Sequence, residues 1–208
     1  MNHSARQLFQ YWHSLKRSAK THPSRRDFNP MAVPALLPSI MLIDTQEPKI
    51  GNIRLAGTGQ DALYQRNLKG EYLPSLFVEA DRSTVHKALQ GLEAQFGAIV
   101  LKAEMCSPEG AFGTEFTFMC LNDDDGRPHQ ALALQTTGIQ KFWKHATPPG
   151  LCKITSFRIV NPDEALRIAD DRSAVQEANV IDFSRRGRAP ENARKVAHLA
   201  VIDGGNHF

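Results

Sequence analysis

Apolar residues recur every three or four positions near the start of the chain, which is the spacing of one helix face. The stripe consists of Leu8, Tyr11, Trp12, Leu15 and Ala19. Ser4 and Gln7 fit a capping box, so we predict an amphipathic helix over residues 4–19. A large aromatic such as Trp12 is costly to leave in water. We therefore expect this helix to pack away from its own strands and to pair with a second subunit. The residues expected at that dimer interface are Leu8, Tyr11, Trp12 and Leu15.

Short runs of β-type and alternating residues predict five strands. These strands are expected at residues 39–45, 50–57, 98–106, 111–121 and 130–138. Turn sequences join the last three, so these strands should be consecutive antiparallel neighbours. A short helix is expected over 59–66, and a longer amphipathic helix over 81–96, between the second and third strands. A sixth apolar run, Leu151–Val160, is also competent to form a strand.

The segment Ile53–Glu71 carries the most informative motif of the chain. It reads IRLAGTGQDALYQRNLKGE, in which a short strand ends at Gly57 and a polar helical turn leads to Gly70. It resembles the strand-to-helix segment of a PAS-like sensory domain family of bacteria. The chain departs from that family at Gln65, where glycine is usual, and at Lys69, where threonine is common.

An upstream segment resembles the same family. The run Arg25–Pro30 is followed by Leu36–Pro38 and Met41–Asp44, in the order and spacing of the family's entry motif. Asn29 stands where the family tends to have aspartate. Two motifs in the correct order are a more specific signal than either alone, and the resemblance covers about residues 8–140.

The resemblance implies an α+β fold, a PAS-like five-stranded antiparallel sheet with helices on one face. An N-terminal helix and a flexible C-terminal tail would flank it. We expect a helical extension at residues 1–30, the PAS-like domain at 31–160 and a partly disordered C-terminal extension at 161–208. Dimerisation through the N-terminal flanking helix is also implied by the resemblance.

The helix at 81–96 must lay its apolar face on the sheet, which creates a cup between the helix and the sheet. The resemblance implies that such a cup is the usual ligand cavity. The residues expected to bind a ligand there are Arg54, Tyr64, His86, Leu89, Leu92, Phe116, Phe118 and Gln135. Two alternatives remain open, because the cup either binds a small molecule or is filled by its own aromatic side chains.

No cofactor can be assigned from the sequence. His86 lies on the helix where haem-binding PAS domains carry their iron ligand, but it also reads as a polar residue flanking an apolar face. The segment after residue 66 has no cysteine, which disfavours a covalent flavin adduct. The G-x-G-x-x-A pattern at 57–62 lacks a βαβ unit and indicates a turn. No metal site is expected, because the eight histidines form no metal-binding motif.

Composition narrows the class of protein. With 41% hydrophobic and 23% charged residues, the chain is typical of a soluble globular protein. It has no apolar run long enough for a membrane span, no secretory signal and no cysteine pair, which indicates the cytoplasm. The first 30 residues carry six basic side chains and one acidic one, without interleaved aromatic residues, so nucleic acid binding is not expected.

No nucleophile–base motif and no kinase, cyclase or DNA-binding output motif is visible, so no catalytic residue is assigned. We predict a non-enzymatic sensory or protein-interaction module in bacterial signal regulation. Such a module would act through a regulatory protein partner or through its own homodimer. The alternative is an enzyme for small molecules built on an α+β cup of the same layout.

Overall fold

The computed structural model describes residues 1–16, 21–107, 110–138 and 148–161, together with the backbone of three short strands beyond them. The predicted C-terminal extension at 161–208 therefore lies almost entirely outside the described residues, as do residues 17–20 of the predicted first helix. Within the described part, no helix is both long and apolar enough to cross a membrane.

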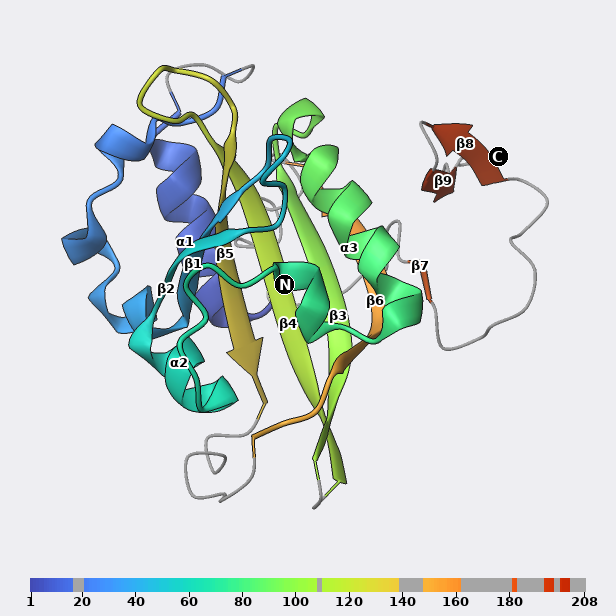
Figure 1. The fold of residues 1–208 in the computed structure, drawn as a ribbon. Helices are drawn as coiled ribbons and strands as arrows, with labels where there is room; N and C mark the ends of the chain where they lie inside the picture. The colour runs from blue at the N-terminus through green and yellow to red at the C-terminus, as the bar shows by residue number, and fades with distance from the viewer. Residues whose placement is uncertain are drawn as a thin grey trace.

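An antiparallel sheet runs through the middle of the described chain (Figure 1). Its strands are β1 (Ile40–Asp44), β2 (Ile53–Ala56), β3 (Ala98–Ser107), β4 (Gly110–Leu121), β5 (Gln130–Thr137), β6 (Cys152–Val160) and β7 (Ile181–Asp182). They lie in the order β2-β1-β5-β4-β3-β6-β7, and all neighbours are antiparallel. Strands β8 (Ala193–Val196) and β9 (Leu199–Ile202) pair with each other in a second sheet.

The predicted α+β fold is confirmed, and β3, β4 and β5 are consecutive antiparallel neighbours as expected. The sheet is wider than the five strands predicted, because the apolar run at 151–160 adds β6 to the free edge of β3 and β7 follows it. The helix predicted at 81–96 ends earlier, at Gln90, and a 3-10 turn, η5 (Leu92–Ala94), leads into β3.

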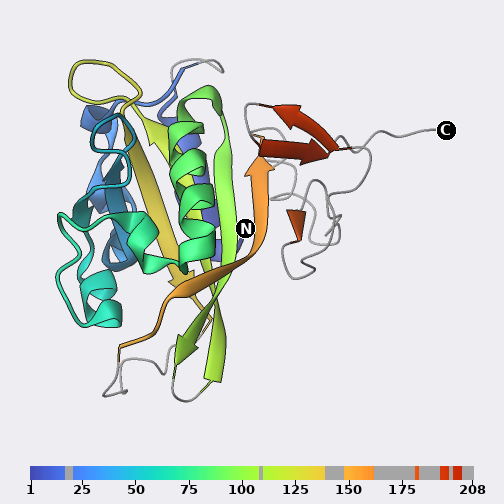
Figure 2. The ribbon, with the colours of Figure 1, turned by 45° about the vertical axis from the view of Figure 1, so that its right-hand side comes forward.

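Helices cover both faces of the sheet. α2 (Thr58–Tyr64) and α3 (Glu79–Gln90) lie on one face, called here the inner face, whereas α1 (His3–Ser14) lies on the opposite, outer face (Figure 2). The remaining turns are 3-10 helices: η1 (Arg25–Asp27), η2 (Pro30–Ala32), η3 (Pro34–Ser39) and η4 (Leu73–Leu76). The prediction of helices on one face, with a separate N-terminal helix, is confirmed by α2 and α3 on the inner face and by α1.

The prediction that the first helix packs away from its own strands is wrong. Leu8 and Trp12 are fully buried on the outer face, and the indole Nε1 of Trp12 donates to the Cys120 carbonyl at 2.8 Å. The physical reason is that the outer face is itself apolar. Its side chains there include Val100, Met119, Leu121, Leu132 and Leu134. Burying the stripe of α1 against this surface removes both apolar faces from water at once.

This packing leaves only two of the four residues predicted for the dimer interface with exposed surface. Leu8 and Trp12 have no exposed surface to offer a second subunit, whereas Tyr11 and Leu15 remain half-buried. The helix also begins earlier than predicted, because Asn2 rather than Ser4 is its cap. The Asn2 Oδ1 atom accepts a hydrogen bond from the Ala5 N–H at 2.9 Å.

His22 follows α1 in the sequence, and its lowered pKa predicts that the stability of the protein depends on pH. The His22 Nε2 atom bonds the Glu93 carbonyl at 2.8 Å, and the imidazole stacks on Phe96 with ring centroids 5.2 Å apart. The His22 Nδ1 atom is buried without a partner among the described residues. Burial lowers the pKa of His22, and the nearby Lys16 lowers it further, against the opposing effect of Glu93.

Because the folded-state pKa of His22 is below its unfolded value of 6.5, the unfolded chain binds the proton more readily. The free energy of unfolding should therefore be highest above pH 6.5 and should fall as the pH drops below it. Urea titrations between pH 7.5 and 5 should show a shallower loss for His22→Gln, whose amide can still donate to Glu93. An identical pH profile in the variant would refute this role of His22.

Candidate functional site

Buried polar side chains gather at the inner face, between α2 and the strands. Gln60 and Tyr64 come from α2, Thr114 from β4 and Gln135 from β5, and each is no more than 4% exposed. Gln60 and Tyr64 are four residues apart, so they share one face of α2. In β4 and β5, Thr114 and Gln135 occupy inward-facing positions of the strand alternation. We call these four residues the inner polar cluster.

Gln135 is the centre of this cluster. Its Nε2 atom donates to the Tyr64 hydroxyl at 3.0 Å and to Thr114 Oγ1 at 3.2 Å. The Gln60 Nε2 atom donates to the main-chain oxygens of Ser39 at 3.3 Å and of Gln135 at 3.2 Å. The cluster thereby connects α2 to β5 and, through Gln135, to β4. These hydrogen bonds lie away from water, where such bonds are electrostatically stronger.

The cluster has one unused acceptor. Among the described residues, the Gln60 Oε1 atom is buried and has no hydrogen-bond partner. Leaving a buried carbonyl oxygen without a donor costs free energy, so native proteins rarely do so without a reason. The arrangement therefore suits a group that brings a hydrogen-bond donor to Gln60.

The titratable groups beside the cluster are neutral at physiological pH. Burial raises the pKa of Tyr64 well above its ordinary value, with a further contribution from Cys152. Burial also raises the pKa of Cys152 to about 12. The Tyr64 hydroxyl lies 3.8 Å from the Cys152 sulfur. These two groups can take part in hydrogen bonds, but neither is an anionic nucleophile at neutral pH.

The apolar residues predicted for the cup lie beside the cluster. Leu89, Leu92, Phe116 and Phe118 are at most 1% exposed and belong to the same inner core as Tyr64. The Phe116 ring stacks on Phe118 at 6.2 Å between centroids. The structure thus brings together six of the eight predicted ligand-site residues, and the four apolar ones pack against their neighbours in the core.

Arg54 and His86 were wrongly assigned to the cup. Arg54 lies at the irregularity in the register between β1 and β2, where the pairing passes from Leu55 to Ile53. Its side chain is half exposed and pairs with Asp44 at 3.4 Å. His86 is one position past the buried stripe of α3, and its Nδ1 atom bonds the Tyr72 hydroxyl at 3.0 Å. This position does not fit a haem ligand, because the imidazole bonds a surface tyrosine outside the inner core.

Sequence reasoning missed Gln60 and Thr114. Thr114 lies between Phe112 and Phe116 in the inward-facing phase of β4, so the alternation alone could have identified it. Gln60 lies one helical turn before Tyr64, and this spacing was the available signal. The described residues contain no group of three or more side chains arranged to hold a metal ion.

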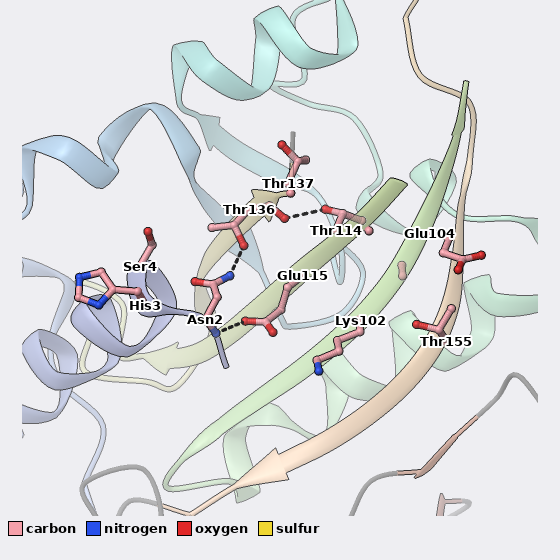
Figure 3. Close-up of a pocket in the computed structure, with 13 residues that line it drawn as sticks. Asn2, His3, Ser4, Lys102, Glu104, Thr114, Glu115, Thr136, Thr137 and Thr155 are labelled. Atoms are coloured by element: carbon pink, nitrogen blue, oxygen red, sulfur yellow. Dashed lines mark hydrogen bonds between the residues drawn. The ribbon is translucent and has the colours of Figure 1, made fainter. Parts of the chain in front are cut away.

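An open groove of about 520 Å³ crosses the outer face beside the first turn of α1 (Figure 3). Its polar side chains include Asn2, Lys102, Glu104, Glu115, Thr136 and Thr155. The Asn2 main-chain N–H donates to the Glu115 carboxylate at 2.9 Å, and the Asn2 side-chain amide donates to Thr136 Oγ1. Asn2 therefore caps α1 and anchors it to β4 and β5.

The groove and the inner polar cluster are joined through the sheet. Gln135 and Thr136 are consecutive in β5 and face opposite sides. The Thr114 hydroxyl, which belongs to the cluster, donates to the Thr136 carbonyl at 3.0 Å. Hydrogen bonds therefore run from Tyr64 through Gln135 and Thr114 to the Thr136 carbonyl, and a separate bond joins the Thr136 hydroxyl to Asn2, the cap of α1.

Comparison with known proteins gives one family. A family model described as a PAS domain matches residues 1–136. No curated protein matches the sequence. Similar solved structures include the PAS domain of an HTR-like protein from Haloarcula marismortui, with 15% identity and a TM-score of 0.39 over 50% of this chain and 86% of that one.

Two light-oxygen-voltage proteins are also similar. An RNA-binding light-oxygen-voltage receptor has 18% identity and a TM-score of 0.39, over 51% of this chain and 32% of the receptor. A light-oxygen-voltage domain described with a flavin analogue has 19% identity and a TM-score of 0.38, over 55% of this chain and 89% of that one.

Proposed function

The chain belongs to the PAS domain family. From this premise we propose that it is a sensory module that binds its signal molecule at the inner polar cluster. The unused Gln60 Oε1 acceptor is the observation that carries this proposal. A small molecule with a hydrogen-bond donor would satisfy it, and the buried Tyr64 hydroxyl and Gln135 amide would orient the molecule's other polar groups. The proposed response is non-enzymatic, which fits a cluster where Tyr64 and Cys152 stay protonated at neutral pH and offer no anionic nucleophile.

Ligand binding requires rearrangement, since the adjoining apolar side chains are packed. The smallest change is rotation of the Gln135 amide, which exchanges donor and acceptor toward Tyr64 and Thr114 without moving the strands. Such a change alters the bond from Gln135 to Thr114, and Thr114 is bonded in turn to the Thr136 carbonyl. The change then alters how α1 packs on the outer face of the sheet, because the cap of α1, Asn2, bonds Thr136.

The partner of this module remains a proposal. We infer that it works in bacterial signal regulation in the cytoplasm, through a regulatory protein or a second copy of the chain. The outer groove beside α1 is the surface that changes if α1 shifts, so a partner there would detect the state of the cluster. Tyr11 and Leu15 are the predicted dimer residues that keep exposed surface.

Thermal shift with a metabolite library tests the ligand proposal. A compound that raises the Tm of the wild type should have no effect on Tyr64→Phe or Gln60→Leu, because both variants lose cluster groups. Tyr72→Phe is the matched control, since its hydroxyl lies outside the cluster and bonds His86. The proposal fails if no compound shifts the wild type, or if Tyr64→Phe responds as fully as Tyr72→Phe.

A further inference from the structure

A second cavity lies at the other end of β5, where the turn from β1 to β2 and the turn from β4 to β5 are on the same side of the molecule (Figure 1). It has a volume of about 270 Å³. The less exposed residues of its wall are Asp44, Asp123, His129 and Gln130, and the exposed ones at its rim include Lys49 and Arg54. We call it the turn pocket.

Gln130 gives the turn pocket an unused acceptor. The residue is 2% exposed, and its Oε1 atom is buried with no hydrogen-bond partner among the described residues. It is paired with Asp44 across β1 and β5, so both side chains lie on the same face of the sheet, and both residues line the pocket. A buried acceptor of this kind is stabilised only by a donor.

Asp123 adds a second carboxylate that is held in its ionised form. Its Oδ1 atom accepts from the N–H groups of Asp125 and Arg127, both at 2.9 Å, and its Oδ2 atom lies 3.0 Å from His129 Nδ1. Burial alone would raise the pKa of Asp123, but these donors bring it below its ordinary value. The wall of the pocket is therefore rich in acceptors and carries negative charge.

The ion pair with Arg54 shows that the Asp44 carboxylate can bind a guanidinium group. The Arg54 guanidinium lies 3.4 Å from the Asp44 carboxylate, while the Arg54 side chain is 49% exposed at the rim. Half-exposed ion pairs of this length contribute little free energy, so an incoming cation can displace this guanidinium. The described residues offer no cluster of metal ligands, which directs the inference to an organic cation.

We propose that the turn pocket binds a small organic cation with N–H donors, an alkylammonium or alkylguanidinium. Its donors bond Gln130 Oε1 and the Asp44 carboxylate, and Asp123 contributes further negative charge. Arg54 competes for the same carboxylate and limits the affinity. The cavity volume suits a compound of a few carbon atoms rather than a folded partner.

Titration of the full chain with ethylguanidinium and butylammonium chlorides at constant ionic strength tests the proposal. Side-chain amide resonances of Gln130 should shift saturably in ¹⁵N spectra. Gln130→Leu should weaken binding about tenfold, because it removes the acceptor. Arg54→Ala, a surface change that keeps the fold, should tighten binding several-fold, because it removes the internal competitor.

Two controls make the outcome decisive. Tetramethylammonium has the same charge but no N–H donor, so it should not saturate the Gln130 resonances. Asp124→Asn removes an exposed carboxylate that pairs with Arg25 and Arg26 outside the pocket, and it should leave the affinity unchanged. The proposal is overturned if no titrant saturates at millimolar concentration, if tetramethylammonium reproduces the shifts, or if Arg54→Ala binds no more tightly than the wild type.

Discussion

Replacing Trp12 with alanine should lower the free energy of unfolding by about 3–5 kcal/mol, because it empties a fully buried site between α1 and the sheet. The change also removes the donor to the buried Cys120 carbonyl. Phe9 and Lys16 each lose one contact as well, since the Phe9 ring centroid lies 5.5 Å from the indole and the Lys16 ammonium lies 5.0 Å from it. Urea unfolding followed by circular dichroism measures the loss.

Leu15→Ala is the matched control on the same predicted stripe, because Leu15 is only half-buried and should cost far less. Light scattering on both variants separates two accounts of α1. If α1 packs on the sheet of its own chain, the Trp12→Ala variant should unfold at a lower urea concentration and keep its subunit number until it unfolds. A variant that dissociates into stable monomers with an unchanged urea midpoint would show instead that α1 faces a partner.

Gln135→Leu should have the second largest effect, a loss of about 1–3 kcal/mol, because it leaves buried groups of the inner polar cluster without their donor. The Tyr64 hydroxyl and Thr114 Oγ1 both accept from this one amide. Chemical denaturation compares the variant with Gln90→Leu, which makes the same substitution at an exposed position at the end of α3. Equal midpoints for the two variants would mean that the cluster is not a structural unit.

The strands could be predicted from local pattern. The expected ranges 98–106, 111–121 and 130–138 fall within one residue of β3, β4 and β5 at each end. Alternation fixes the faces of these strands, and turn sequences rich in Gly, Pro and Asp fix their ends. Both signals lie within a few residues of the strand they describe.

The docking of α1 could not be predicted in the same way. The stripe containing Trp12 shows that an apolar surface must cover it, but not which one. The covering residues, such as Met119 and Leu132, lie more than 100 positions away, and only the assembled sheet brings them together. A periodic pattern reports burial, whereas the identity of the partner surface depends on long-range topology.

The candidate site was predictable in part for a similar reason. Tyr64 and Gln135 were identifiable as polar residues in apolar surroundings, and both belong to the cluster. The unused acceptors of Gln60 and Gln130 could not be inferred, because hydrogen-bond satisfaction depends on atomic positions across several strands. Arg54 was misplaced because an irregularity in the register of β1 and β2 is invisible in the alternation.

The most direct test of the coupling between the inner polar cluster and α1 is a double-mutant cycle on Gln135→Leu and Asn2→Ala. These residues act on opposite faces of the sheet and are joined through Thr114 and Thr136. If the hydrogen bonds carry a signal, the two losses in unfolding free energy should depart from additivity by more than about 0.5 kcal/mol. Additive losses, within about 0.3 kcal/mol, would contradict the account and leave α1 as a structural cover only.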